Sequence, residues 1–210
     1  MKIILFGASG KTGLELTRQA LERQHEVTAF IRPTSTFALQ HERLQRATGQ
    51  LDDVPALVNA IQGQDVVVSA LGAAHPFTYD PVVVIGMGNI LQAMKSAGVH
   101  RLIYLSPLAV KENRGEAGFF LHYIAPVLLR TEIRGHEDRE ALIKKSGLNW
   151  TLVRAPFLTL GPHTGQFKMG PDLQFHGFLP KLSRADVADA MLQQLASNDP
   201  PCTKIRVLPD

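Results

Sequence analysis

The residues best suited to bind a charged ligand form a glycine-rich segment near the start of the chain. Gly7, Gly10 and Gly13 follow the apolar run 3–6 at intervals of three. A tight turn needs a residue that tolerates positive φ, and a pyrophosphate lying on the backbone leaves no room for a Cβ atom. Apolar residues at helical spacing come next, so the N–H groups of a first helical turn would face the phosphates. We expect a dinucleotide site that uses Gly7, Ser9, Gly10, Lys11, Thr12 and Gly13. The alternative is an ordinary strand-to-helix turn that merely contains glycine.

Arg32 stands at the end of a strand predicted over 27–31. In a site that prefers NADH, a carboxylate about 20 residues beyond the glycines usually binds the ribose 2′-hydroxyl. A guanidinium, followed here by the hydroxyls of residues 34–36, suits the 2′-phosphate of NADPH instead. We therefore expect NADP(H) as the cofactor. The alternative is that Arg32 is a solvated loop residue.

A continuous apolar strand predicted over 65–70 would lie in the centre of a parallel sheet. It ends in Ala70, Leu71 and Gly72. Small residues at this end let a cofactor lie against the backbone, at the edge where such sheets bind ligands. We expect all three residues to contribute to the cofactor site.

Composition limits the class of protein. The 210 residues are 45% hydrophobic and 20% charged, a balance typical of a globular domain, and the net charge of +3 does not favour nucleic acid. No apolar run approaches the roughly 18 residues that a membrane span requires. The single cysteine, Cys202, fits a reducing compartment, and the first strand leaves no room for a signal peptide, so we expect a cytoplasmic protein. The histidines show no metal-ligand spacing, so no metal is expected.

The glycine spacing, G-x-x-G-x-x-G, resembles that of the short-chain dehydrogenase/reductase superfamily. Further matches cover nearly the whole chain and resemble an atypical branch, which includes NmrA-like regulators, quinone reductases and the flavin reductase/biliverdin reductase family. They are the segments 6–13, 99–106, 136–156 and 182–188, with Arg32 and Gly165. The resemblance implies that the corner at Asp52 lies beside the adenine of the cofactor. Asp52 or its neighbour Asp53 can also cap a helix predicted over 54–61.

The catalytic pair common in short-chain reductases, Tyr-x-x-x-Lys, is absent. In that pair the tyrosine donates the proton and the lysine lowers its pKa. Tyr123 is followed four residues later by Val127. Ser106, at the end of a strand predicted over 101–106, stands where relatives carry a catalytic hydroxyl, although Pro107 replaces the usual second hydroxyl residue.

His136 is the second catalytic candidate. The sequence predicts that it heads a helix running to about residue 145, and the resemblance places a histidine here near the reactive ring of the cofactor. Such a histidine can orient a substrate or donate a proton at neutral pH. The alternative is that His136 and Glu140 form an i, i+4 pair on a helix surface.

Two further segments are candidates for the substrate pocket. The loop 73–81, with His75, Phe77 and Tyr79, either covers a flat substrate or packs as a surface loop. Pro156 follows a strand predicted over 150–153, and this turn either forms a wall beside the nicotinamide or is only a rigid strand exit. Residues 158–181 are predicted to be a long irregular flap.

These observations predict an α/β chain with a Rossmann-like doubly wound parallel sheet, helices on both faces and a small C-terminal substrate lobe. Residues 1–210 would form a single NAD(P)-binding domain, with segments of about 107–135 and 158–181 building the lobe. The function expected first is an NADPH-dependent reductase that transfers hydride to a flat, electron-poor acceptor such as a flavin, a quinone or a biliverdin-like molecule. A non-catalytic NmrA-like NADPH sensor comes second. An epimerase or dehydratase comes third because it needs the catalytic tyrosine. The sequence does not indicate the oligomeric state.

Overall fold

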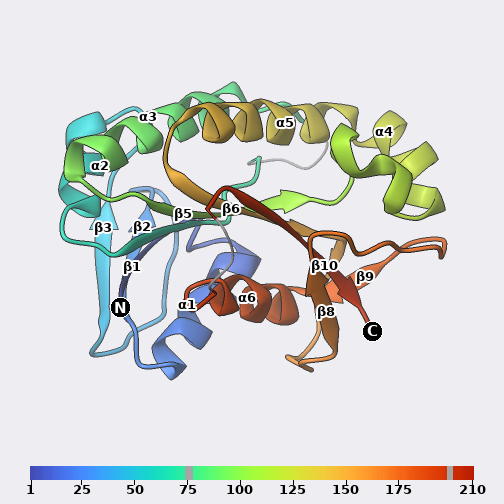
Figure 1. The fold of residues 1–210 in the computed structure, drawn as a ribbon. Helices are drawn as coiled ribbons and strands as arrows, with labels where there is room; N and C mark the ends of the chain where they lie inside the picture. The colour runs from blue at the N-terminus through green and yellow to red at the C-terminus, as the bar shows by residue number, and fades with distance from the viewer. Residues whose placement is uncertain (74–77, 198–200) are drawn as a thin grey trace.

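The computed structural model describes residues 1–73, 78–197 and 201–210, which form a three-layer α/β fold (Figure 1). The strands of the main sheet are β1 (Lys2–Phe6), β2 (Glu26–Ile31), β3 (Leu44–Thr48), β4 (Val66–Ser69), β5 (Arg101–Pro107), β6 (Asn149–Ala155), β8 (Phe167–Gly170) and β10 (Thr203–Pro209). Their order is β3-β2-β1-β4-β5-β6-β10-β8. The pairs from β3 to β10 are parallel, and β8 runs antiparallel to β10 at the edge.

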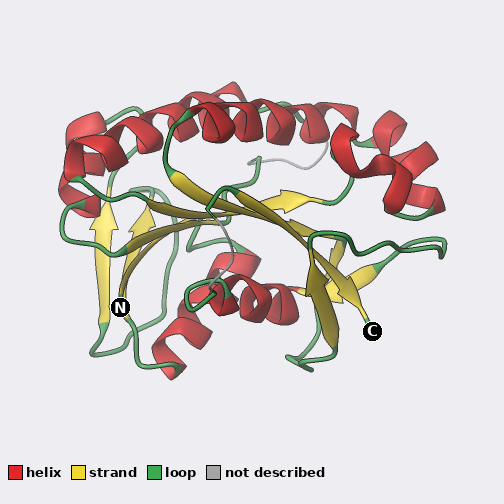
Figure 2. Ribbon diagram, viewed as in Figure 1, coloured by secondary structure: helices red, strands yellow, loops and turns green. Residues whose placement is uncertain are grey.

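Helices cover both faces of this sheet (Figure 2). One face carries α1 (Lys11–Glu22) and α6 (Arg184–Gln193), and the other carries α2 (Val54–Ile61), α3 (Pro81–Ala97) and α5 (Arg130–Lys145). The chain reverses its direction across the sheet between β1 and β4, and doubly wound sheets bind ligands at the carboxyl ends of the strands beside such a point. The predicted Rossmann-like fold is confirmed.

The hydrophobic core explains why these residues form these elements. All four residues of β4 are buried, as expected for a central parallel strand covered on both faces. Along β5, Leu102 and Tyr104 pack beneath α5, while Ile103 and Leu105 pack against the other layer. This alternation also decides which β5 side chains reach α5.

A smaller hydrophobic cluster lies beyond the end of β5. It joins residues 108–133, which include the short helices η1 (Lys111–Glu116), η2 (Phe120–Ile124) and α4 (Ala125–Leu128), to Leu173, Phe175 and Leu179. Backbone bonds connect the same segments, because the N–H groups of Phe119 and Phe120 donate to the carbonyls of Gly177 and Phe178 at 3.2 and 2.9 Å.

The predicted irregular flap over 158–181 is wrong in part. Strand β8 lies within it, and the short strands β7 (Phe157–Thr159) and β9 (Lys181–Ser183) pair at its two ends. Strand β8 satisfies backbone groups on the edge of β10 that would otherwise lack strand partners. Four residues without clear alternation gave no strand signal in the sequence.

Candidate cofactor and active site

The glycine-rich turn packs tightly against the end of β4. Gly7 has a φ of +82°, and a Cβ atom built there would lie 2.8 Å from the carbonyl carbon and oxygen of Ala70. A Cβ on Gly13 would lie 2.0 Å from the carbonyl oxygen of Gly7. Both positions therefore require glycine, and the turn brings Gly7 and Ala70 together at one sheet edge.

The amino end of α1 has the features of an anion site. Gly10 is the N-cap and supplies no side-chain cap, and the first turn holds no acidic residue. Gly10 and Lys11 are exposed, Ser9 is half-buried and Thr12 is buried. The N–H groups of a first helical turn have no intrahelical acceptors and favour negative charge. The open backbone around Gly10 fits a cofactor diphosphate.

The remaining predicted cofactor residues occupy the same carboxyl edge. Arg32 is exposed and directly follows β2, and Gly72 is exposed two residues beyond Ala70. Asp53 is the residue that caps α2, because its Oδ1 accepts from the Ala56 N–H at 3.0 Å. Asp52 is exposed beside it at the same corner. Pro156 is buried directly after β6. Contact of these residues with a cofactor stays a prediction.

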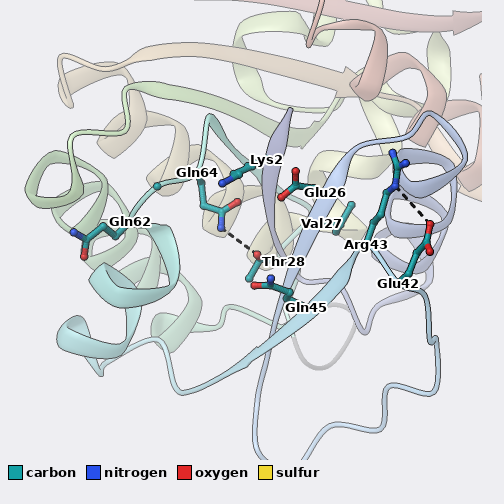
Figure 3. A pocket seen from close by; sticks show the side chains of 10 residues that line it. Lys2, Glu26, Val27, Thr28, Glu42, Arg43, Gln45, Gln62 and Gln64 are labelled. Carbon is teal, nitrogen blue, oxygen red and sulfur yellow. Dashed lines mark hydrogen bonds and ion pairs between the residues drawn. The ribbon is translucent and has the colours of Figure 1, made fainter.

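A cavity of about 650 Å³ lies at the other end of the sheet (Figure 3). It is lined by residues at the amino ends of the strands, including Lys2, Glu26 and Arg43, and by Gln64, whose Nε2 donates to Thr28 Oγ1 at 3.1 Å. Because the glycine-rich turn follows the carboxyl end of β1, this cavity is not the predicted cofactor site.

Helix α5 does not begin where the sequence predicted. It starts at Arg130, so His136 lies inside the helix and does not head it. His136 is 9% exposed and Glu140 is 3% exposed, which places this i, i+4 pair on the buried face. The surface-pair alternative is therefore wrong.

His136 pairs with a tyrosine of β5. Its Nδ1 lies 2.8 Å from the hydroxyl of Tyr104, a side chain with no exposed surface. Burial, aided by the positive charge of Arg139, holds the pKa of His136 well below its usual range, and burial raises the pKa of Tyr104. His136 is therefore neutral at pH 7. The predicted role of His136, to orient a substrate or donate a proton, stays a prediction.

Ser106 belongs to a buried ionic network. Its hydroxyl donates to Glu140 Oε1 at 2.6 Å, and Arg154 Nη2 on β6 lies 2.8 Å from Glu140 Oε2. Burial alone would raise the pKa of Glu140, but the hydrogen bonds from Arg154, Ser106 and Lys144 and the charge of Arg154 outweigh it, so the pKa is lowered. The ionised carboxylate can only accept, so it engages the proton of Ser106. Ser106 is 1% exposed.

Arg139 connects α5 to the predicted cofactor edge. Its Nη1 donates to the Leu71 carbonyl at 2.6 Å and its Nε to the Gly135 carbonyl at 2.8 Å, and the guanidinium carbon lies 5.8 Å from the centre of the Tyr104 ring. Arg139, Arg154 and Tyr104 are not among the site residues predicted from the sequence. A charged residue inside the apolar run of β6 was the one available signal for Arg154.

The other aromatic candidates lie in different parts of the structure. The hydroxyl of Tyr79 donates to Asp138 Oδ2 on α5 at 2.9 Å, whereas His75 and Phe77 lie outside the described residues. Tyr123 is 62% exposed and packs on Phe119 with ring centroids 5.0 Å apart, in the segment beyond β5.

Among the described residues, no group of three or more His, Cys, Asp or Glu side chains could hold a metal. In the same residues, no helix combines the length and apolar character needed to cross a membrane.

Comparisons with known proteins find relatives that cover most of the chain. The chain is 29% identical over 208 residues to an uncharacterised chloroplastic protein of Arabidopsis thaliana, covering 93% of this chain and 74% of the relative. It is 27% identical to a Bacillus subtilis protein named as an uncharacterised sugar epimerase, covering 93% and 88%.

Two solved structures share the fold. A short-chain dehydrogenase/reductase of Veillonella parvula in complex with NADP superimposes with a TM-score of 0.79 at 22% identity, covering 98% of this chain and 93% of that one. An anaerobilin reductase of Escherichia coli O157:H7 superimposes with a TM-score of 0.75 at 23% identity, covering 100% and 97%. Residues 7–198 match the NAD(P)H-binding family, and the chain belongs to that family.

Proposed function

We propose that the protein is an NADPH-dependent reductase that acts on a flat, electron-poor acceptor such as a flavin, a quinone or a biliverdin-like molecule. One observation carries the proposal. At the carboxyl edge, the hydroxyl of Ser106 donates to the carboxylate of Glu140 at 2.6 Å, so its proton is not available to a substrate. A conjugated acceptor suits such a site because it delocalises the negative charge that it gains. The name of the anaerobilin reductase that shares the fold supports the same class of acceptor.

The reaction balances without a strong protein acid. Bound NADPH supplies a hydride, which carries two electrons to the acceptor, and the acceptor then takes one proton from solvent while NADP⁺ is released. The protein contributes position and electrostatics. Ser106 keeps the end of β5 attached to α5 through Glu140, and this makes it a positioning residue.

NADPH is proposed over NADH because of Arg32. Its exposed guanidinium directly follows β2, where a carboxylate would otherwise bind a ribose hydroxyl. A guanidinium can bind a 2′-phosphate with two charge-assisted hydrogen bonds. We propose a reducing compartment, the cytoplasm, since Cys202 is a free thiol.

The epimerase name of one relative supports a second candidate, but the site disfavours it. Tyr123, with Val127 in place of the lysine, projects from the exposed surface of the segment beyond β5. The other alternative is a non-catalytic NmrA-like sensor, which would bind NADPH without oxidising it.

The test is NADPH consumption by the purified protein with FMN, riboflavin, biliverdin and 1,4-naphthoquinone, with NADH in parallel. Turnover with at least one of these acceptors, faster with NADPH, is the expected result. A Gly10→Ala variant, which places a methyl group in the diphosphate cradle, should lower kcat/KM for NADPH about tenfold or more. Tight NADPH binding with no reduction of any acceptor would favour the sensor, and epimerisation of a sugar nucleotide would favour the epimerase.

A further inference from the structure

The pairing of Tyr104 with His136 lies level with the predicted cofactor turn. In the sheet register, Phe6 of β1 pairs with Ser69 of β4, and Ser69 pairs with Tyr104 of β5. Gly7 and Ala70 come next along their strands. His136, which is hydrogen-bonded to Tyr104, therefore lies beside the carboxyl edge where β1 and β4 end.

The protons of this pair can be assigned. Tyr104 has no exposed surface, so its hydroxyl cannot donate to water, and a buried donor without an acceptor is costly. Among the residues that the structure describes, the hydrogen-bond partner of this hydroxyl is His136 Nδ1, at 2.8 Å. A neutral imidazole that accepts at Nδ1 must carry its proton on Nε2.

We infer that Tyr104 fixes His136 as the neutral Nε2–H tautomer, and that this N–H donates a hydrogen bond to the acceptor oxygen on which negative charge collects after hydride transfer. This inference rests on the proposed function. Tyr104 is the positioning residue and His136 the catalytic one. The charged groups nearby agree with a neutral ring, because the guanidinium of Arg139 lies against Tyr104 and the carboxylate of Glu140 is engaged by Arg154 and Ser106.

A neutral imidazole can polarise an oxygen without giving up its proton. Such a donor stabilises developing charge and needs no reorganisation during the reaction. This role replaces part of what a catalytic tyrosine would supply, and it suits an acceptor that takes its proton from solvent.

The first test is the tautomer of His136 in the cofactor-free, ¹⁵N-labelled protein at pH 7. Long-range ¹H–¹⁵N correlation spectra distinguish the two tautomers and the imidazolium, and the signals of His136 are those missing in His136→Gln. We expect the Nε2–H tautomer in the wild type, a shift towards the other tautomer in Tyr104→Phe, and no change in Tyr123→Phe. An Nδ1–H tautomer or an imidazolium in the wild type would overturn the inference.

The second test is steady-state reduction of 1,4-naphthoquinone by NADPH. A glutamine side chain can place an amide N–H near the position of Nε2, whereas asparagine reaches only the position of Nδ1. His136→Asn and Tyr104→Phe should each lower kcat about tenfold, the effect of losing one hydrogen bond, with the KM for NADPH unchanged. His136→Gln should retain most of the turnover, and equal losses in the Gln and Asn variants would contradict a donor at Nε2.

Different results would contradict the proposed function and the inference about His136. No turnover with any acceptor would contradict the proposed function and the donor role together, even if the spectra show Nε2–H. Turnover that persists while the spectra show Nδ1–H would contradict this inference alone.

Discussion

Glu140 and Arg154 form an ion pair, with Oε2 and Nη2 2.8 Å apart, although their side chains are only 3% and 1% exposed. The pair connects α5 to β6, and through Ser106 it also holds the end of β5. Three elements that meet at the carboxyl edge are therefore fixed relative to one another by buried charge.

Replacing one member of this pair should be costly. Arg154→Leu removes the buried guanidinium from Glu140 and leaves Lys144, whose Nζ lies 3.0 Å from Oε2 on a half-buried side chain, as a cationic partner. We expect a loss of about 3 kcal/mol in the free energy of unfolding, measured with urea. Arg18→Leu, which removes a guanidinium paired only on the exposed face of α1, should cost about 0–1 kcal/mol. Similar losses in both variants would show that the buried pair contributes no more than a surface one.

The buried neutral histidine makes stability depend on pH. His136 has a lowered pKa in the folded state, so between its ordinary value of about 6.5 and that lower value the unfolded chain binds a proton that the folded chain does not. The contribution is fully present above about pH 6.5 and is lost as pH falls through this interval. The melting temperature of His136→Gln should therefore fall less than that of the wild type between pH 7 and 5. His100→Gln, at an exposed position, should follow the wild type.

The glycine cradle can be tested by adding one methyl group. A Cβ on Gly10 would lie 3.2 Å from the Gly7 carbonyl oxygen, so the turn must shift slightly, and the φ of −75° at Gly10 is allowed for alanine. Gly10→Ala should fold normally but weaken NADPH binding about tenfold or more, a loss of at least about 1.4 kcal/mol, measured by calorimetric titration. Gly88→Ala, where a Cβ meets nothing within 4 Å, is the matched control on α3. Unchanged affinity in Gly10→Ala would exclude the diphosphate from this turn.

Arg32 is expected to determine which nicotinamide cofactor binds. Its replacement by alanine removes the charge-assisted hydrogen bonds to the 2′-phosphate, so the Kd for NADPH should rise about tenfold to a hundredfold. NADH, which lacks this phosphate, serves as the internal control and should bind as before. An equal change for both cofactors would mean that Arg32 does not contact the 2′-phosphate.

The fold could be predicted from the sequence because each pattern that indicates a strand, turn or helix lies within a short segment. Buried strands, a glycine turn and amphipathic helices alternate, and this pattern predicts a doubly wound parallel sheet. The crowding of Gly13 against the Gly7 carbonyl lies within one turn, whereas that of Gly7 against Ala70 joins two strands.

The chemistry beneath α5 could not be predicted because it depends on how a helix crosses a strand. Tyr104 and Ser106 share one face of β5, and they meet His136 and Glu140 one helical turn apart. The two partners in each of these contacts are 32 or 34 residues apart in sequence. Helical spacing shows that His136 and Glu140 share a face of α5, but it does not show whether that face packs on the sheet or faces solvent.

The most direct test of the central claim is transfer of deuterium from NADPH deuterated at C4 of the nicotinamide to the acceptor. The acceptor that turns over fastest should be reduced with NADPH deuterated on one face of C4 and, separately, on the other, and the NADP⁺ formed should be analysed by mass spectrometry. We expect NADP⁺ to lose the deuterium of one labelled form and to keep that of the other, and an acceptor that retains the transferred hydrogen at carbon, such as biliverdin, to gain the deuterium that is lost. NADPH that binds but is never oxidised would contradict the account.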